Sequence, residues 1–225
     1  MRTTMRPRRK EPDMSDLQNG KYVERYGVSD RANHWVVAIL FVLLALTGLA
    51  FFHPAFFFLS NVLGGPVWSR ILHPFLGIVM VVSFIGLARR VWHENFIKPV
   101  DIAWLKMIEE VINNGDGPDK LPIGKYNAGQ KLMFWTMVGS VAALLLSGIV
   151  IWRSYFAMYF PIPVIRFAMV IHMLAGFTGI LALIIHVYAA IWVKGTLRAM
   201  TRGNVDANWA KHHHPEWFKE QTGSK

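Results

Sequence analysis

Histidine is the residue type in this 225-residue chain best suited to hold a metal or a metal-containing group. The chain contains nine histidines and no cysteine, which excludes disulfides, cysteine-ligated iron–sulfur clusters and covalent haem attachment through a C-x-x-C-H motif. Four histidines lie at or inside long apolar runs, where an imidazole is costly and by default marks a functional site. These four are His34, His73, His172 and His186.

The spacing of these histidines predicts two sites at different depths. His172 and His186 lie 14 residues apart in the last apolar run, and at 100° per residue this is about 40° short of four turns. Both therefore point to one face, about 21 Å apart along the axis. Successive apolar runs cross in opposite directions. His34, at the start of the first run, is therefore level with His186, toward the end of the last run. His73, at the start of the second run, is level with His172, near the start of the last run. Two stacked pairs of imidazoles are typical of bis-histidine haem ligation inside a helix bundle.

Small residues favour the same interpretation. Gly176 and Gly179 follow His172 on its own helical face, and a glycine lets a flat macrocycle approach the backbone closely. Two alternatives stay open on residue types alone. The histidines could be hydrogen-bonded packing residues between helices. A zinc site is disfavoured because no span contains a carboxylate, and two histidines per level leave a tetrahedral metal underligated.

The elements that position these histidines are predicted to be transmembrane helices. Hydrophobic residues make up 53% of the chain, charged residues 17%, and the mean hydropathy is +0.32, which disfavours a disordered chain or an ordinary soluble enzyme. A helix needs about 20 mostly apolar residues to cross a bilayer. Four runs without Asp, Glu, Lys or Arg meet this requirement: Trp35–Phe52, Ile71–Leu87, Leu132–Trp152 and Phe167–Val193.

Basic residues predict the orientation of the four spans. The net charge is +10, and of 24 Lys and Arg residues 8 precede the first span, 7 lie between the second and third, and 6 follow the fourth. Since cytoplasmic loops carry the excess of Lys and Arg, both termini are expected in the cytoplasm. We expect a cytoplasmic tail at 1–33, an all-α four-helix membrane domain at 34–193 and a second cytoplasmic tail at 194–225. Met14 is an alternative start to Met1.

The other histidines are expected to be less specialised. His212, His213 and His214 form a run in the C-terminal tail and predict a surface or partner contact rather than a metal site. His53 follows the first span beside Pro54 and is expected to be exposed in a loop.

Several motifs, taken in order, resemble the cytochrome b (gamma) subunit of membrane-bound respiratory formate dehydrogenase. The resemblance runs from about Arg25 to Glu220. The wider superfamily includes the cytochrome b subunits of nickel–iron hydrogenases and of thiosulfate reductase. The motifs are Asp30-Arg-Ala-Asn-His34-Trp, Arg70-Ile-Leu-His73-Pro-Phe, Gly124-Lys-Tyr-Asn-Ala-Gly-Gln-Lys131, Ile151-Trp-Arg, His186-x-Tyr-x-Ala-x-Trp-Val-Lys-Gly195 and Trp209-Ala-Lys-x-His-His-Pro-x-Trp217.

The resemblance implies two non-covalent b-type haems, one near each membrane face. By position, His73 and His172 would ligate the periplasmic haem iron, while His34 and His186 would ligate the cytoplasmic haem iron. The resemblance also implies a quinone site beside the cytoplasmic haem, at Asn127, Gly129 and Gln130, with protons entering past the loop at 113–131. Without the resemblance, these three residues are ordinary turn and helix-start residues.

The resemblance further implies partners and a location. An iron–sulfur subunit would dock on the periplasmic side of the bacterial inner membrane, and a molybdenum or tungsten subunit beyond it would oxidise formate. The whole is expected to form a trimer of heterotrimers. This chain has no ligands for a formate-oxidising centre, so it is expected to act as the electron-transfer and quinone-reducing subunit. The rival functions are the same role in a hydrogenase or thiosulfate reductase, and a non-redox anchor or transporter.

Three basic residues lie on the far side of the membrane from the basic tails. They are Arg70, Arg153 and Arg166. Haem propionates are carboxylates and need a cationic partner, so these arginines are candidates to neutralise the propionates of the outer haem. The alternative, to which we give equal weight, is that these arginines cap helices or contact lipid headgroups.

Overall fold

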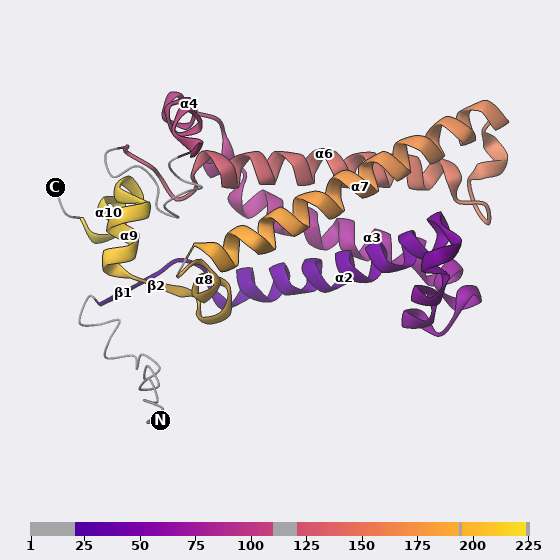
Figure 1. Cartoon of the computed structure of the whole chain (residues 1–225), viewed down its shortest axis with the longest axis horizontal. Helices are drawn as coiled ribbons and strands as arrows, with labels where there is room; N and C mark the ends of the chain where they lie inside the picture. The colour runs from indigo at the N-terminus through magenta and orange to yellow at the C-terminus, as the bar shows by residue number, and fades with distance from the viewer. Residues whose placement is uncertain (1–20, 110–120, 194, 224–225) are drawn as a thin grey trace, which may run out of the picture.

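The computed structural model describes residues 21–109, 121–193 and 195–223. Within these residues, four helices are long and apolar enough to cross a membrane (Figure 1). They are α2 (Val28–Phe52), α3 (Pro66–Val91), α6 (Ala128–Ile151) and α7 (Ile162–Trp192). The all-α membrane fold is therefore confirmed. The alternative start at Met14 lies outside the described residues, as does part of the loop at 113–131.

All four helices begin earlier than the predicted spans, because the spans are defined by apolar residues alone. In α2 the added first turn carries Asp30, whose negative charge suits the positive end of the helix dipole. α3 continues through Pro74, the residue after His73. The longest helix, α7, has 31 residues and measures about 46 Å at 1.5 Å per residue, more than the hydrocarbon thickness of a bilayer. We therefore expect α7 to tilt or protrude.

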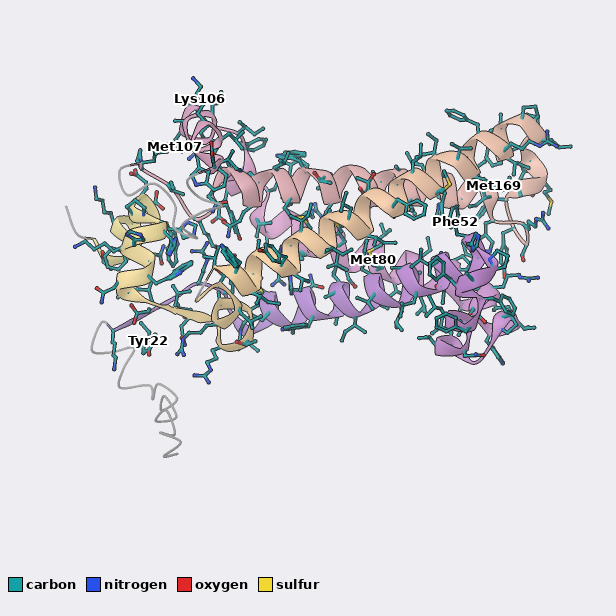
Figure 2. All side chains as sticks on the ribbon, in the orientation of Figure 1. Tyr22, Phe52, Met80, Lys106, Met107 and Met169 are labelled. Atoms are coloured by element: carbon teal, nitrogen blue, oxygen red, sulfur yellow. The ribbon has the colours of Figure 1, made fainter. Side chains whose placement is uncertain are left out.

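The helices form two antiparallel hairpins, α2 with α3 and α6 with α7, that pack into one elongated bundle. The bundle core is built from apolar side chains of α2, α3 and α6, including Phe41, Met80 and Phe84. Figure 2 shows Met80 between the helices in the middle of the bundle. Most other apolar side chains point outward, such as Val82 at 65% exposure, as expected for helices solvated by lipid.

The two ends of the bundle differ. At the end that we name the loop end, 3₁₀ segments connect the helices: η1 (Pro54–Leu63) after α2 and η3 (Ala157–Tyr159) after α6. At the other end, which we name the terminal end, the first and the last described segments, β1 (Tyr22–Glu24) and α10 (Pro215–Thr222), lie on the same side of the bundle as the starts of α2 and α6. The terminal end also carries η2 (His93–Asn95), α4 (Pro99–Lys106), α8 (Thr196–Arg202), α9 (Ala207–His213) and α10 (Pro215–Thr222).

A two-stranded antiparallel sheet ties the beginning of the described chain to its end. β1 (Tyr22–Glu24) pairs with β2 (Asn204–Asp206), with Val23 opposite Val205. Val205, Ala210 and Trp217 form a small buried core beneath this sheet. The described residues before α2 (21–27) and after α7 (195–223) thus pack into one cap at the terminal end, which we name the terminal cap.

Candidate functional site

The four histidines of the apolar runs meet as two pairs in the bundle. At the loop end, the rings of His73 on α3 and His172 on α7 have centroids 6.5 Å apart and planes inclined at 58°. At the terminal end, the rings of His34 on α2 and His186 on α7 have centroids 6.2 Å apart and planes inclined at 49°. The pairing by depth expected from helix geometry is the pairing that the structure contains.

The separation within each pair suits two ligands on opposite sides of one metal ion. A metal–nitrogen bond is about 2.0 Å, and a ring nitrogen lies about 1.1 Å from its ring centroid, so two such rings have centroids about 6 Å apart. The described residues contain no group of three or more His, Cys, Asp or Glu that could hold a metal. Two imidazoles underligate a bare ion, but they complete the coordination of haem iron, whose porphyrin supplies the other four nitrogens. The residues present therefore fit a haem.

Hydroxyl side chains support both histidines of the loop-end pair. The Thr47 Oγ1 atom lies 2.7 Å from His73 Nδ1, and the Ser147 Oγ atom lies 3.0 Å from His172 Nδ1. Thr47 is fully buried. Sequence analysis missed both hydroxyls, although each is followed by a glycine and faces a histidine 25 or 26 residues later.

The glycines near the histidines have different roles. A Cβ atom at Gly148 would lie 3.4 Å from His172 Cε1, so Gly148 packs directly against this ring. A Cβ atom at Gly179 would lie 2.9 Å from Phe41 Cζ, so this glycine admits an aromatic ring of α2. At Gly77 a Cβ atom would meet nothing within 4 Å.

The segment expected to bind quinone forms the start of α6 at the terminal end. Asn127 caps this helix: its side-chain oxygen accepts the Gln130 backbone N–H at 3.0 Å, and the Gln130 side-chain oxygen accepts the Asn127 backbone N–H at 3.1 Å. Both side-chain oxygens are thus engaged, whereas the two NH2 groups make no hydrogen bond within the described residues. This segment therefore offers a ligand the hydrogen-bond donors of these two NH2 groups.

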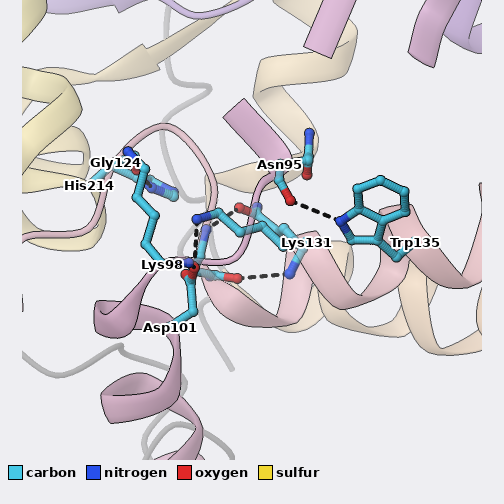
Figure 3. Close-up of polar contacts among 9 residues, drawn as sticks. Asn95, Lys98, Asp101, Gly124, Lys131, Trp135 and His214 are labelled. Atoms are coloured by element: carbon cyan, nitrogen blue, oxygen red, sulfur yellow. Dashed lines mark hydrogen bonds and ion pairs between the residues drawn. The ribbon is translucent and has the colours of Figure 1, made fainter. Parts of the chain in front are cut away.

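Helix α4 packs over the same segment. A Cβ atom at Gly129 would lie 3.2 Å from Trp104 Cη2, so the glycine makes room for this indole. Next to it, the Lys131 ammonium and the Asp101 carboxylate form an ion pair at 2.7 Å with both side chains 5% exposed (Figure 3). The same carboxylate oxygen accepts the backbone N–H of Lys98 at 2.7 Å. This buried pair fixes α4 against the start of α6.

The terminal cap encloses an arginine and a histidine. His214 is 1% exposed, so the expectation of a surface residue is wrong for His214. Its Nδ1 lies 2.8 Å from the Gly124 carbonyl oxygen and its Nε2 lies 3.2 Å from the Arg25 guanidinium. Because a guanidinium only donates, His214 Nε2 accepts and Nδ1–H donates to Gly124. Burial, followed by the Arg25 charge, lowers the pKa of His214 well below 6.5.

Aromatic rings surround the Arg25 guanidinium. It lies 4.8 Å from the ring centroid of Trp217 and 6.0 Å from that of Tyr126, and it also donates to the Lys125 carbonyl oxygen. Burial raises the pKa of Tyr126, so the phenol is neutral. Sequence analysis missed this cluster, since its members come from three distant segments. Outside it, His53 is exposed as expected, and its ring accepts the Ala55 backbone N–H.

The three arginines considered for haem propionates all lie at the loop end. Arg70 is in the first turns of α3, Arg153 follows α6, and Arg166 is in the first turns of α7. All three are exposed, and none forms an ion pair with another described residue. They lie at the same end as the pair formed by His73 and His172.

Known proteins with similar sequences carry a haem of the expected type. A family model described as prokaryotic cytochrome b561 matches residues 25–203. The cytochrome b556(fdo) subunit of formate dehydrogenase from Escherichia coli K12 is 46% identical over 198 residues, which cover 88% of this chain and 92% of that protein.

Two further relatives agree with this match. The nitrate-inducible formate dehydrogenase cytochrome b556(Fdn) subunit of the same organism is 44% identical over 204 residues, covering 91% of this chain and 94% of that protein. The formate dehydrogenase cytochrome b556 subunit of Haemophilus influenzae Rd is 40% identical over 210 residues, covering 93% and 88%. The chain therefore belongs to the prokaryotic cytochrome b561 family of membrane haem proteins, and its resemblance to the cytochrome b subunits of formate dehydrogenases is confirmed.

Proposed function

We propose that this chain is the dihaem cytochrome b subunit of a formate dehydrogenase and reduces quinone at its terminal end. The observation that carries the proposal is the two pairs of imidazoles, with centroids 6.5 Å and 6.2 Å apart, at the two ends of one bundle. A bound haem b supplies reversible one-electron transfer. His73 and His172 hold the iron of one haem, and His34 and His186 hold the iron of the other.

The orientation of the chain follows from its basic residues. Among the described residues, the segments at the terminal end hold 13 Lys and Arg residues, while those at the loop end hold three arginines. The positive-inside rule then places the terminal end in the cytoplasm and the loop end in the periplasm of a bacterial inner membrane. Electrons enter at the loop end, beside the His73 pair, and leave at the terminal end, beside the His34 pair.

The two NH2 groups of Asn127 and Gln130 suit a quinone. A quinone carbonyl oxygen is an acceptor, and both amides present donors at the same end of the bundle as His34 and His186. Reduction of one quinone to quinol takes two electrons, which arrive one at a time, and two protons. The protons come from the cytoplasm, so each turnover moves charge across the membrane.

The relatives' names support the choice of partner complex. Each is a cytochrome b556 subunit of a formate dehydrogenase, and the matches cover most of both chains. We propose that an iron–sulfur subunit docks at the loop end and is fed by a molybdenum or tungsten subunit that oxidises formate. The complex is proposed to be a trimer of such heterotrimers. Arg70 and one of Arg153 or Arg166 are proposed to neutralise the propionates of the loop-end haem.

The test separates quinone reduction from the earlier electron transfers. In the purified complex, Asn127→Asp with Gln130→Glu removes both NH2 groups but retains the side-chain oxygens that cap α6. Formate should still reduce both haems, while steady-state quinone reduction slows by about tenfold, as expected for two lost hydrogen bonds. Unchanged quinone reduction would remove Asn127 and Gln130 from the site. Purification with hydrogenase subunits instead would reject formate dehydrogenase as the partner.

A further inference from the structure

The two hydroxyls at the loop-end histidines have a defined polarity. Thr47 Oγ1 lies 2.9 Å from the Leu43 carbonyl oxygen, and Ser147 Oγ lies 2.5 Å from the Ala143 carbonyl oxygen, each four residues back in its own helix. A carbonyl only accepts, so each hydroxyl uses its one hydrogen there. Each hydroxyl oxygen can therefore only accept a hydrogen bond from the imidazole, through a lone pair.

The tautomer of each histidine follows from this polarity. Since the hydroxyl oxygen can only accept in this direction, Nδ1 of each histidine must carry the hydrogen and donate it. These Nδ1–H···O hydrogen bonds measure 2.7 Å for His73 and 3.0 Å for His172. A neutral imidazole has one N–H, so Nε2 of each ring keeps its lone pair. Nε2 is then the atom available to a metal, and the opposite polarity would leave an Nε2–H that cannot bind iron.

The arrangement occurs once in each hairpin. Thr47 and Gly48 on α2 face His73 on α3, and Ser147 and Gly148 on α6 face His172 on α7. The glycine after each hydroxyl lies against the ring: a Cβ atom at Gly48 or Gly148 would stand 3.8 Å or 3.4 Å from the ring Cε1 atom, in van der Waals contact. Two helices of different sequence thus build the same support.

The terminal-end histidines have no such support. His34 Nδ1 is buried and has no hydrogen-bond partner within the described residues. No side-chain hydrogen bond of His186 occurs there either. A hydrogen bond from the outer ring nitrogen raises the basicity of a metal-ligating imidazole, and a more basic ligand favours the more positively charged metal. The two pairs therefore differ as ligands, although both are bis-imidazole.

We propose that Thr47 and Ser147 are positioning residues that fix the Nδ1–H tautomers of His73 and His172 and lower the reduction potential of the loop-end haem below that of the terminal-end haem. The inference rests on the proposed function, in which each pair holds one haem. A lower potential at the loop end makes the transfer of each electron toward the terminal end favourable. The gradient thus points toward the quinone site.

The test compares the two haems after removal of one hydroxyl at a time. Thr47→Val and Ser147→Ala remove the acceptor, whereas Thr47→Ser and Ser147→Thr retain it. Thr178→Val is the matched control, because Thr178 also donates to the carbonyl oxygen four residues back, at 2.9 Å to Leu174, but is exposed and forms no hydrogen bond with a histidine among the described residues. Optical redox titration of the purified complex measures each haem separately.

In Thr47→Val and Ser147→Ala the reduction equilibrium of one haem should shift about fivefold toward the reduced form, about 40 mV for a one-electron couple at 59 mV per tenfold. The other haem, the hydroxyl-retaining variants and Thr178→Val should keep the wild-type potentials. Equal shifts of the reduction potential at both haems, or no shift at either, would overturn the inference. A hydroxyl that only filled space would not be expected to change the potential of one haem selectively. A wild-type complex with fewer than two haems would instead overturn the proposed function.

Discussion

The buried ion pair between Asp101 and Lys131 offers a prediction whose size follows from the structure. Asp101→Asn keeps an oxygen for the Lys98 backbone N–H but removes the negative charge 2.7 Å from the Lys131 ammonium. Both side chains are 5% exposed, so water cannot compensate the remaining charge. Removing one partner of a buried pair costs about 3–5 kcal/mol. At about 1.4 kcal/mol per tenfold, the open population of α4 should rise at least about a hundredfold.

Hydrogen exchange of the α4 backbone amides, measured on the purified complex, reports this opening directly. Asp30→Asn is the matched control: Asp30 pairs with Arg90 at 2.5 Å, but these side chains are 36% and 47% exposed, and an exposed pair is worth at most about 1 kcal/mol. Asp101→Asn combined with Lys131→Met removes both charges and should restore most of the protection. Exchange in Asp101→Asn no faster than in Asp30→Asn would refute the argument.

The same change should reach the proposed quinone site. Because α4 places Trp104 over Gly129, loosening α4 disturbs the first turn of α6 without touching either histidine pair. Asp101→Asn should therefore slow quinone reduction while formate still reduces the haems at the wild-type rate.

Two further predictions concern the terminal cap. Burial lowers the pKa of His214 well below 6.5, so the unfolded cap binds a proton that the folded cap excludes, and the stability present above pH 6.5 is lost as pH falls below it. The protection factors of the α10 amides, which correct for the slower intrinsic exchange at low pH, should therefore fall on acidification, and His214→Gln should abolish that dependence. Gly203 has φ of +83°, and a Cβ atom there would lie 2.7 Å from the Tyr26 carbonyl oxygen, so Gly203→Ala should destabilise the terminal cap by about 2 kcal/mol or more. Gly223 has φ of +63° but open space around it, so Gly223→Ala should cost only about 1 kcal/mol. Urea titration followed by tryptophan fluorescence measures the stability of both variants.

Helix periodicity made the membrane-spanning part predictable. A continuous apolar run of about 20 residues in lipid forms a helix, since a helix satisfies its backbone groups within the segment. Once the runs are helices, a 14-residue spacing fixes the face and depth of His172 relative to His186. The partners on the other helices then follow from the direction of the chain, and the structure brings those rings together.

The terminal cap and the hydroxyl supports could not be predicted in the same way. Arg25 and His214 lie 189 residues apart, and no period connects them. The strands of the cap have three residues each, too few for an alternation pattern. Thr47 and Ser147 look like any hydroxyl residue bonded to its own helix. Only the packing of the next helix shows that each also faces a histidine.

The central claim is that the chain holds two haems, one on each pair of histidines. The most direct test is the haem-to-chain ratio of the purified complex, measured from its reduced absorbance spectrum, in the wild type and in His172→Ala. We expect two haems b per chain in the wild type. In His172→Ala we expect one, because the pairs are about 21 Å apart and share only α7. A wild type without a b-type spectrum, or a folded His172→Ala protein that lacks both haems, would contradict the account.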